Sequence, residues 1–293
     1  SVADINDGRI PSSETAFATV SDDLQIISHN SLESRFGAWN TTDGTPQWSL
    51  KSRSASSTAI SSAIGGIFLQ GDSIGRIAVR SSSNGSLVND FKIFERPVTA
   101  VQLSPDHERA VATDTRGGVT VFDPSDGRTI FELNSHTSIA KVAIFSPDAK
   151  MLVTGGNDKA VKVWDMSTGE LINDLRGHTE AVTAAAFSAD GKLLATGSAD
   201  DTIKIWRCSD WKLERELGGF SNGVASIVFT PDGTRLAAAT DVGLIRFWDP
   251  LDGLQVFALS ASEKGVNKIA FSDGGKILVS IDAGAKIRLW RTV

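Results

Sequence analysis

Short stretches of alternating apolar and polar residues run through the chain, and small polar residues separate them. The clearest example lies between Gly177 and Arg207. Val, Ala, Leu and Ile recur in 182–187, 192–197 and 202–206, whereas the segments between them are rich in Ala, Asp and Gly. Alternation over about four to eight residues is typical of half-buried strands, and Asp and Gly are typical of turns. The pattern therefore predicts three β-strands joined by tight turns.

The same pattern recurs at a fixed interval of 42 residues. A heavy apolar residue marks each copy, and another apolar residue precedes it by 19 positions. The heavy residues are Phe122, Trp164, Trp206, Trp248 and Trp290. The residues that precede them are Leu103, Phe145, Phe187, Phe229 and Phe271. A fixed period of about 20–50 residues indicates one repeated structural unit, as in solenoids and propellers.

A fourth strand follows each heavy residue, and the predicted fourth strands are 45–50, 86–91, 128–133, 170–175, 212–217 and 254–259. A turn glycine introduces it five positions after the heavy residue. These glycines are Gly44, Gly85, Gly127, Gly169 and Gly253. Only the fifth copy departs, because it has Trp211 at this position. The glycine register extends back to Trp39 and Arg80, which gives seven units of four strands.

These features resemble the WD-repeat β-propeller family. Trp164-Asp165 and Trp248-Asp249 match the dipeptide that gives the family its name, and Gly177-His178 matches its second characteristic dipeptide. The resemblance covers nearly the whole chain, is strong over 134–207 and is weak over 1–90. It implies an all-β fold, namely a seven-bladed β-propeller of four-stranded antiparallel blades around a central channel. We expect residues 1–293 to form this single domain.

The last repeat ends at Val293, directly after its third strand, and therefore lacks a fourth one. Counting back in register from Val20 places residues 3–8 where such a strand should lie. Val2 and Ile5 are the apolar residues available to anchor it. We expect the N-terminal segment to complete the last blade and close the ring, which would leave only short sheet edges.

Composition indicates which cellular environment and which classes of partner the protein is expected to have. The net charge of −6 is spread along the chain and disfavours nucleic acid, because phosphate binding needs a concentrated basic face. No apolar run approaches the ~18 residues that suggest a membrane span, and no secretory leader is recognisable. The single cysteine, Cys208, excludes an internal disulfide and fits a reducing compartment, so we expect a cytoplasmic protein. Because the chain starts at Ser1 without Met, an upstream segment is expected to have been removed or left out.

His178, Ser198 and Asp200 supply the residue types of a hydrolase triad, but their spacing belongs to the repeat. His precedes Asp by 22 residues in the fourth repeat too, and each Asp precedes its Trp by six. A set that is copied with the register belongs to the fold. The family resemblance implies a hydrogen-bonded chain in which Asp holds His and Ser bridges to the indole N–H. The predicted structural network comprises His136, Asp158, Trp164, His178, Ser198, Asp200 and Trp206.

The other repeats lack parts of this network. Gly156 occupies the serine position of the fourth repeat, so its network is expected to be partial. The remaining repeats lack the His–Asp pair and are expected to rely on apolar packing. We expect no catalytic, metal-binding or cofactor-binding residue and no cofactor, because the four histidines lie far apart and no phosphate-binding glycine loop is present.

The resemblance also implies a binding face, formed by the loops that enter the first strands and by the turns between second and third strands. In the family this face commonly binds proteins or peptides. The residues predicted there are Thr99, Thr115, Arg116, Lys141, Asn157, Thr183, Asp241 and Asn267. Arg116 and Lys141 favour an acidic or phosphorylated partner segment. The alternative is that all eight are ordinary solvated loop residues, since exposed polar side chains need no special reason.

Trp211 lies on the opposite face, and two interpretations are open. As an exposed aromatic residue it is a candidate second-face anchor for a partner. Alternatively, it folds over its own fourth strand and shields Leu213.

The predicted function is a non-catalytic protein or peptide scaffold, as one module of a larger protein or complex. The first strands, which would face the channel, are almost free of acids and bases, with Lys141 and Lys268 as exceptions. This argues against chemistry in the channel. Two alternatives remain: an enzyme or small-ligand-binding propeller that uses the channel, and a structural domain of a homo-oligomer. Partner identity and oligomeric state are not encoded in any recognisable motif.

Overall fold

The computed structural model describes residues 2–3, 15–20, 25–30, 35–40, 45–51, 57–61, 65–133, 136–240, 242–284 and 286–291. Within these residues the strands form seven antiparallel sheets of four strands each, which we call blades 1 to 7. Blade 1 comprises β2 (Thr15–Val20), β3 (Gln25–Asn30), β4 (Arg35–Asn40) and β5 (Pro46–Lys51). Blade 2 comprises β6 (Ser57–Ile60), β7 (Ile67–Asp72), β8 (Arg76–Ser81) and β9 (Leu87–Lys92). Blade 3 comprises β10 (Val98–Leu103), β11 (Ala110–Asp114), β12 (Val119–Phe122) and β13 (Thr129–Glu132).

Blades 4 to 7 follow the same plan. Blade 4 comprises β14 (Ala140–Phe145), β15 (Met151–Gly156), β16 (Val161–Asp165) and β17 (Leu171–Leu175), and blade 5 comprises β18 (Val182–Phe187), β19 (Leu193–Ser198), β20 (Ile203–Arg207) and β21 (Lys212–Leu217). Blade 6 comprises β22 (Val224–Phe229), β23 (Leu236–Thr240), β24 (Leu244–Trp248) and β25 (Gln255–Ser260). Blade 7 comprises β26 (Val266–Ser272), β27 (Ile277–Asp282), β28 (Ile287–Arg291) and β1 (Val2–Ala3).

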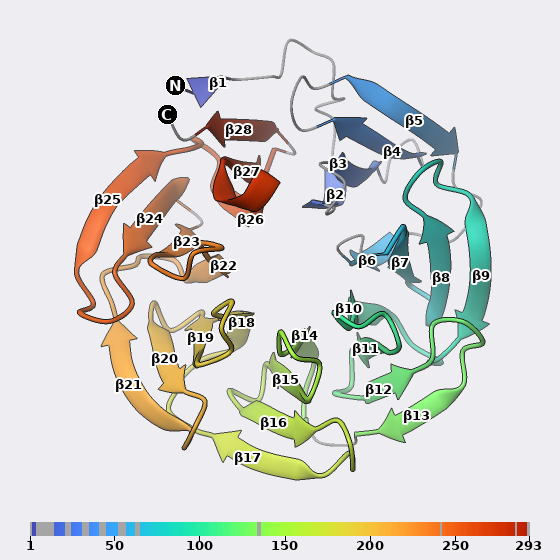
Figure 1. The fold of residues 1–293 in the computed structure, drawn as a ribbon, viewed down its shortest axis with the longest axis horizontal. Coiled ribbons are helices and arrows are strands. Elements are labelled where there is room, and N and C mark those ends of the chain that lie inside the picture. Colours follow the sequence, from blue (N-terminus) through green and yellow to red (C-terminus); the bar gives the residue numbers. More distant parts are fainter. Residues whose placement is uncertain are drawn as a thin grey trace.

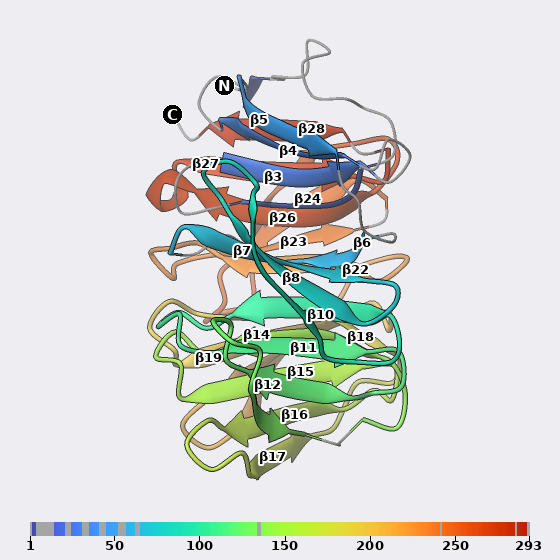
Figure 2. The ribbon, with the colours of Figure 1, turned by 90° about the vertical axis from the view of Figure 1, so that its right-hand side faces the viewer.

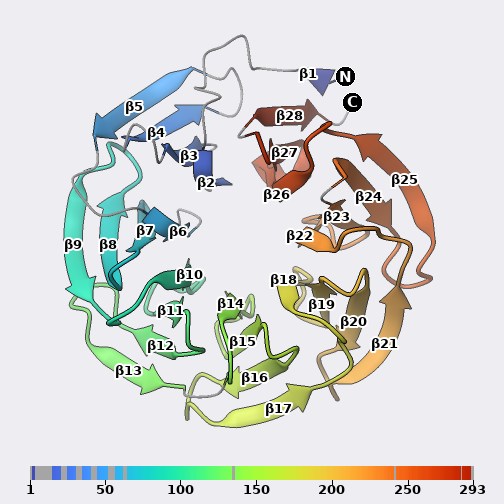
Figure 3. The same cartoon turned by 180° about the vertical axis from the view of Figure 1, so that it is seen from behind.

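The blades are arranged around a common centre, as a β-propeller (Figure 1). The first strand of each blade lies nearest the centre, and the fourth lies at the periphery, as the opposite view also shows (Figure 3). One single-turn 3-10 segment, Asp273–Gly275, joins β26 to β27. The described residues contain no α-helix, and none of their segments is a helix that could span a bilayer.

The N-terminal strand supplies the outer strand of blade 7. β1 pairs antiparallel with β28, with Val2 opposite Trp290 and Ala3 opposite Leu289. The first and last strands of the chain therefore lie side by side (Figures 1 and 2). The strand predicted at residues 3–8 begins one residue earlier, and residues 4–8 lie outside the described part of the chain.

Apolar side chains of the middle strands are buried between neighbouring blades, so the core is shared rather than divided among the blades. Ile203 and Ile205 of blade 5 pack in one cluster with Val224, Phe229 and Leu236 of blade 6. Each such side chain contributes roughly 1.5–3 kcal/mol when it is fully buried. An isolated blade would lose this burial on both faces, which favours stacking around a ring.

The turn before the fourth strand requires a left-handed backbone conformation. Gly85, Gly127, Gly169 and Gly253 have φ angles of 71°, 77°, 75° and 75° there. Trp211 adopts the same conformation with φ of 57°, although a side chain makes it unfavourable by roughly 1–2 kcal/mol. The periodic glycine of the sequence therefore has a direct backbone cause.

Candidate functional site

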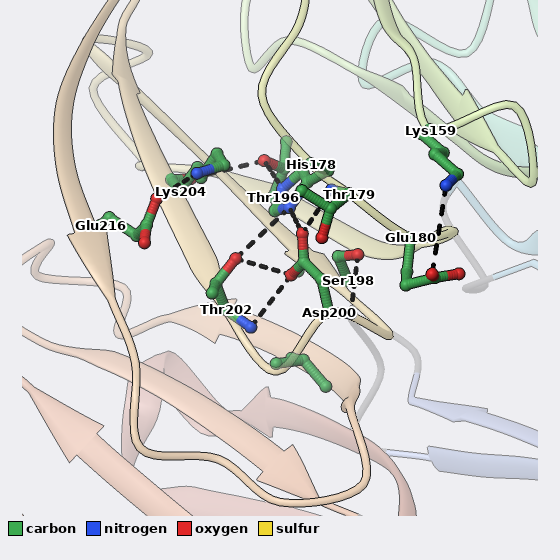
Figure 4. A network of polar contacts seen from close by, with 12 residues as sticks. Lys159, His178, Thr179, Glu180, Thr196, Ser198, Asp200, Thr202, Lys204 and Glu216 are labelled. Atoms are coloured by element: carbon green, nitrogen blue, oxygen red, sulfur yellow. Dashed lines mark hydrogen bonds and ion pairs between the residues drawn. The ribbon is translucent and has the colours of Figure 1, made fainter.

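A buried chain of hydrogen bonds runs through blade 5. His178 Nδ1 lies 2.9 Å from Asp200 Oδ2, and His178 Nε2 lies 2.9 Å from Thr196 Oγ1 (Figure 4). The indole N–H of Trp206 donates to the same hydroxyl at 2.9 Å. The backbone N–H of Thr179 donates to Asp200 at 2.8 Å. The chain thus ties the entry loop of the blade to its second strand, its β19–β20 turn and its third strand.

Blade 4 contains the same chain. His136 Nδ1 lies 2.9 Å from Asp158 Oδ1, and His136 Nε2 lies 2.8 Å from Thr154 Oγ1. The Trp164 indole donates to Thr154 at 3.0 Å, and the Thr137 N–H donates to Asp158 at 3.1 Å. Two neighbouring blades are therefore locked by the same four side-chain types.

Both chains fit a neutral histidine. Nδ1–H donates to the carboxylate, and Nε2 accepts from the threonine hydroxyl, whose oxygen accepts from the indole. Burial lowers the pKa of His136 and of His178 below 6.5, and the hydrogen bonds that the two rings donate to the carboxylates only partly oppose this. For Asp200, burial acts to raise the pKa, but hydrogen bonds from Thr202, the Thr179 N–H and His178 together lower the pKa to about 2. At neutral pH the pair is thus imidazole and carboxylate.

The bridging hydroxyl is Thr196 and not Ser198, so the prediction of Ser198 in this role is wrong. Ser198 Oγ instead accepts from the backbone N–H of Asp200 at 3.1 Å. The strand register explains the difference, because Trp206 pairs with Leu194. The residue at 196 is then the diagonal neighbour of the indole, and the residue at 198 lies one step beyond its reach.

The prediction of a partial network in blade 4 is wrong for the same reason. Gly156 does not interrupt the chain, because Thr154 provides the hydroxyl. The sequence contains a signal for this residue: Thr154 and Thr196 each precede their tryptophan by ten positions.

The geometry does not assemble a nucleophile with a base. Ser198 Oγ is fully buried, and the described contacts of His178 are with Asp200, Thr196 and Thr202 rather than with this hydroxyl. Burial raises the pKa of the Cys208 thiol to about 12, so it stays protonated and weakly reactive at neutral pH.

In other blades too, the residue ten positions before the heavy residue accepts a hydrogen bond from the heavy residue's side chain. In blade 2, Arg80 Nε donates to Gln70 Oε1 at 2.8 Å. In blade 7, the Trp290 indole donates to Ser280 Oγ at 2.8 Å. Blade 6 is different, because Phe220 occupies the histidine position and packs against Trp248 with ring centres 5.0 Å apart.

Blades 2, 3 and 7 stabilise the turn between second and third strands with another aspartate, located at the position that Ser198 holds in blade 5. Its Oδ1 accepts two backbone N–H groups, two and four residues further on, at 2.8–3.0 Å; these aspartates are Asp72, Asp114 and Asp282. The expectation that these blades rely on apolar packing alone is therefore wrong.

Five of the eight predicted face residues converge on the entry to β14. The Thr99 hydroxyl and the Asn157 N–H donate to carbonyls of residues 139–140. The β11–β12 turn packs against residues 136–138, which precede β14. Gly117 of this turn lies so close to them that a Cβ added to it would be 2.6 Å from the Ser138 carbonyl oxygen. We call this group the blade 3–4 face; it consists of Thr99, Thr115, Arg116, Lys141 and Asn157.

The charge of the blade 3–4 face is positive. Arg116 and Lys141 are exposed, and neither forms an ion pair within the described residues. Arg96 is a further cation at this turn: it forms an ion pair at 3.5 Å with Asp114, which also accepts the Arg116 N–H. The sequence carries a signal for Arg96, because it stands two residues before the first strand β10.

The remaining predicted face residues do not join this group. Thr183 lies on β18 of blade 5, and Asn267 is exposed on β26, across the ring from β14 (Figure 1). Asp241 lies outside the described residues.

Trp211 is half-buried and packs against an apolar cluster that includes Leu194 and Trp206. Leu213 is 47 % exposed, so Trp211 does not shield it as one interpretation expected. The contacts of Trp211 lie at the boundary of blades 4 and 5, and they favour a packing role in this boundary over an anchor for a partner.

Polar side chains of the inner strands join neighbouring blades. The Thr183 hydroxyl donates to the carbonyl of Val224, as Thr99 does to blade 4. Gln102 Oε1 accepts from the N–H of Phe145 at 2.8 Å. Ser226 accepts an N–H of blade 7 at 3.2 Å. The described inner strands are therefore connected by hydrogen bonds as well as by packing. Across these residues no group of three or more His, Cys, Asp or Glu could hold a metal ion.

Comparison with known families supports the repeat directly. The family model described as WD domain, G-beta repeat matches four consecutive segments, 127–165, 169–207, 211–249 and 253–291, which make up just over half of the chain. The chain belongs to the WD-repeat family. A search of curated proteins found no matching relative. Each matched WD segment begins at the turn before a fourth strand, so it spans the outer strand of one blade and the three inner strands of the next.

Proposed function

We propose that this WD-repeat protein is a non-catalytic scaffold that binds a protein or peptide through the blade 3–4 face. WD-repeat domains generally mediate protein interactions. The blade 3–4 face is favoured as the binding surface by the convergence of two adjacent blades on the entry to β14, with two exposed cations left without an ion pair among the described residues.

The chemistry of the face favours an acidic partner segment. Arg116 extends from a turn whose backbone is fixed by Asp114 Oδ1 at 2.8 Å from the Arg116 N–H. A guanidinium held on a rigid turn can donate two parallel hydrogen bonds to a carboxylate or phosphate. Lys141 adds a second charge on the neighbouring blade. An extended segment with acidic or phosphorylated side chains is therefore the proposed partner.

The test is a capture experiment with defined peptides. A library of acidic and phosphorylated peptides is presented to the wild-type chain and to Arg116→Glu, with Lys150→Glu as the control. Lys150 lies in the β14–β15 turn and its side chain is 81 % exposed, so the control carries the same charge change away from the face. We expect the wild type and the control to bind the same peptides and Arg116→Glu to lose them. Equal binding by all three variants would remove the face from the proposal.

We also propose that residues 1–293 form a single domain whose ring is closed by the N-terminal strand. The pairing of β1 with β28 supports this, because it gives blade 7 its fourth strand. Deletion of residues 1–10 should then lower the thermal unfolding midpoint. An unchanged midpoint would show that the ring does not depend on this strand.

A further inference from the structure

The inner strands of blades 2 to 7 enclose a cavity of about 250 Å³ at the centre of the ring. Its lining comes from β6, β10, β14, β18, β22 and β26 (Figure 3). The lining is mostly Ala, Val and Ile, with a few hydroxyl and amide groups and two lysines, Lys141 and Lys268. This size suits a small molecule or ion and not a folded partner.

The charge of these strands has one sign only. The seven first strands, β2 included, contain no Asp or Glu, and their only cationic residues are Lys141 and Lys268. The two lysines come from blades 4 and 7, on opposite sides of the ring (Figure 1). Neither forms an ion pair or a hydrogen bond through its side chain to any residue in the described ranges.

Other polar groups of the lining already have partners. The hydroxyls of Thr99 and Thr183 are used between blades, as are Gln102 Oε1 and the Ser226 oxygen. The amide nitrogen of Gln102 has no acceptor among the described residues, so it remains a donor at the cavity. The groups that are left over are therefore donors and cations.

An uncompensated ammonium in this place is unfavourable. Lys268 is accessible to solvent inside the cavity, yet protein atoms surround it, and this desolvation lowers the pKa of its ammonium below 10.5. Groups that are kept in an unfavourable environment without a structural partner are candidates for function.

We propose that the central cavity binds a compact phosphorylated polyanion, which Lys141 and Lys268 contact from opposite sides while the Gln102 amide donates a further hydrogen bond. Two separated cations suit a ligand with two phosphoryl groups better than a single one. This small-anion site is distinct from the peptide-binding face, although Lys141 lies at the border of both.

Inorganic pyrophosphate is the probe, with inorganic phosphate, citrate and chloride as comparisons at matched ionic strength. Calorimetric titration and thermal unfolding are measured on the wild type, Lys141→Gln, Lys268→Gln and the control Lys150→Gln. We expect saturable one-to-one binding of pyrophosphate, a raised unfolding midpoint and at least about tenfold weaker binding by each channel variant. The control should bind as the wild type does. Citrate binding as tightly as pyrophosphate would overturn the assignment to a phosphorylated ligand.

A second measurement follows the lysine side chains by NMR. The pKa of Lys268 should rise when pyrophosphate binds, because an anion stabilises the ammonium. Undiminished pyrophosphate binding by the Lys141→Gln, Lys268→Gln double variant, or no effect of pyrophosphate on the wild type, would overturn the proposal. Arg116→Glu should bind pyrophosphate normally, so loss of peptide binding and loss of anion binding are separable results.

Discussion

Replacement of Thr196 by Val tests whether the hydrogen-bonded chain of blade 5 stabilises the fold. Val keeps the approximate volume and the strand preference of Thr and replaces the hydroxyl by a methyl group. Thr196 is fully buried, and Trp206 beside it is 4 % exposed, so water cannot readily replace the lost group. The change leaves two polar atoms without partners, the indole N–H of Trp206 and Nε2 of His178.

The expected cost follows from these two atoms. A buried donor or acceptor left unsatisfied costs about 1–3 kcal/mol, so the pair gives a loss of roughly 2–6 kcal/mol in the free energy of unfolding. Ser198→Ala is the matched control. Its hydroxyl accepts one backbone N–H in this blade, and blade 4 has Gly156 at the same position, so a loss of about 1 kcal/mol or less is expected.

The assay is equilibrium unfolding in urea, followed by tryptophan fluorescence and by far-ultraviolet circular dichroism so that coincidence of the two transitions can be checked. Thr154→Val should reproduce the effect in blade 4, because its contacts are equivalent. The reasoning is refuted if Ser198→Ala costs as much as Thr196→Val, or if both threonine variants unfold at the wild-type urea concentration.

Three further predictions concern charge and backbone. The protein should lose stability as the pH falls below 6.5, because burial lowers the pKa of both His136 and His178 and the unfolded chain then binds protons that the folded chain does not. Two such groups allow a slope of up to about 2.7 kcal/mol per pH unit, and a thermal midpoint that is constant from about pH 7 to 5 would contradict this. Lys268→Met should raise the free energy of unfolding at neutral pH, since it removes a desolvated charge. This gain in stability should shrink as the pH rises toward 10.5, because the lysine of the wild type then becomes neutral. A variant that unfolds at a lower urea concentration than the wild type would contradict this prediction. Trp211→Gly should be more stable than Trp211→Ala by about 1 kcal/mol, because only glycine accepts φ of 57° freely, and equal unfolding midpoints would exclude that cause.

The period of the sequence predicts the strands well because each strand has a simple burial pattern. The segments 182–187 and 212–217 coincide with β18 and β21. In β21 the final Leu217 is buried while Leu213 is exposed, which is the pattern of an outer strand. Because the repeat has a fixed period, the strand positions in the clear copies predict the strand positions in the less clear ones.

The side-chain partners were harder to predict from the period. Ser198 occurs in the correct strand and on a plausible side, but the contact with Trp206 depends on which residues pair across β19 and β20. A spacing along the chain does not give that lateral register. The aspartates at the same position in blades 2, 3 and 7 do not follow from the His–Asp spacing, because the same turn can be closed by an aspartate at either of two positions.

The heavy position and the residue ten positions before it give a rule that a sequence can provide. An indole N–H is paired with a hydroxyl in Trp206 and Thr196, a guanidinium is paired with an amide in blade 2, and Phe122, which has no donor, is paired with Ala112. The residue type thus changes with the donor because the site between the strands is buried, and an unmatched donor there would be costly. Trp248 is an exception, since Ala238 occupies its partner position. In this blade Phe220 occupies the histidine position and its ring packs against Trp248. Ring packing therefore fixes the indole in place of the hydrogen-bonded chain.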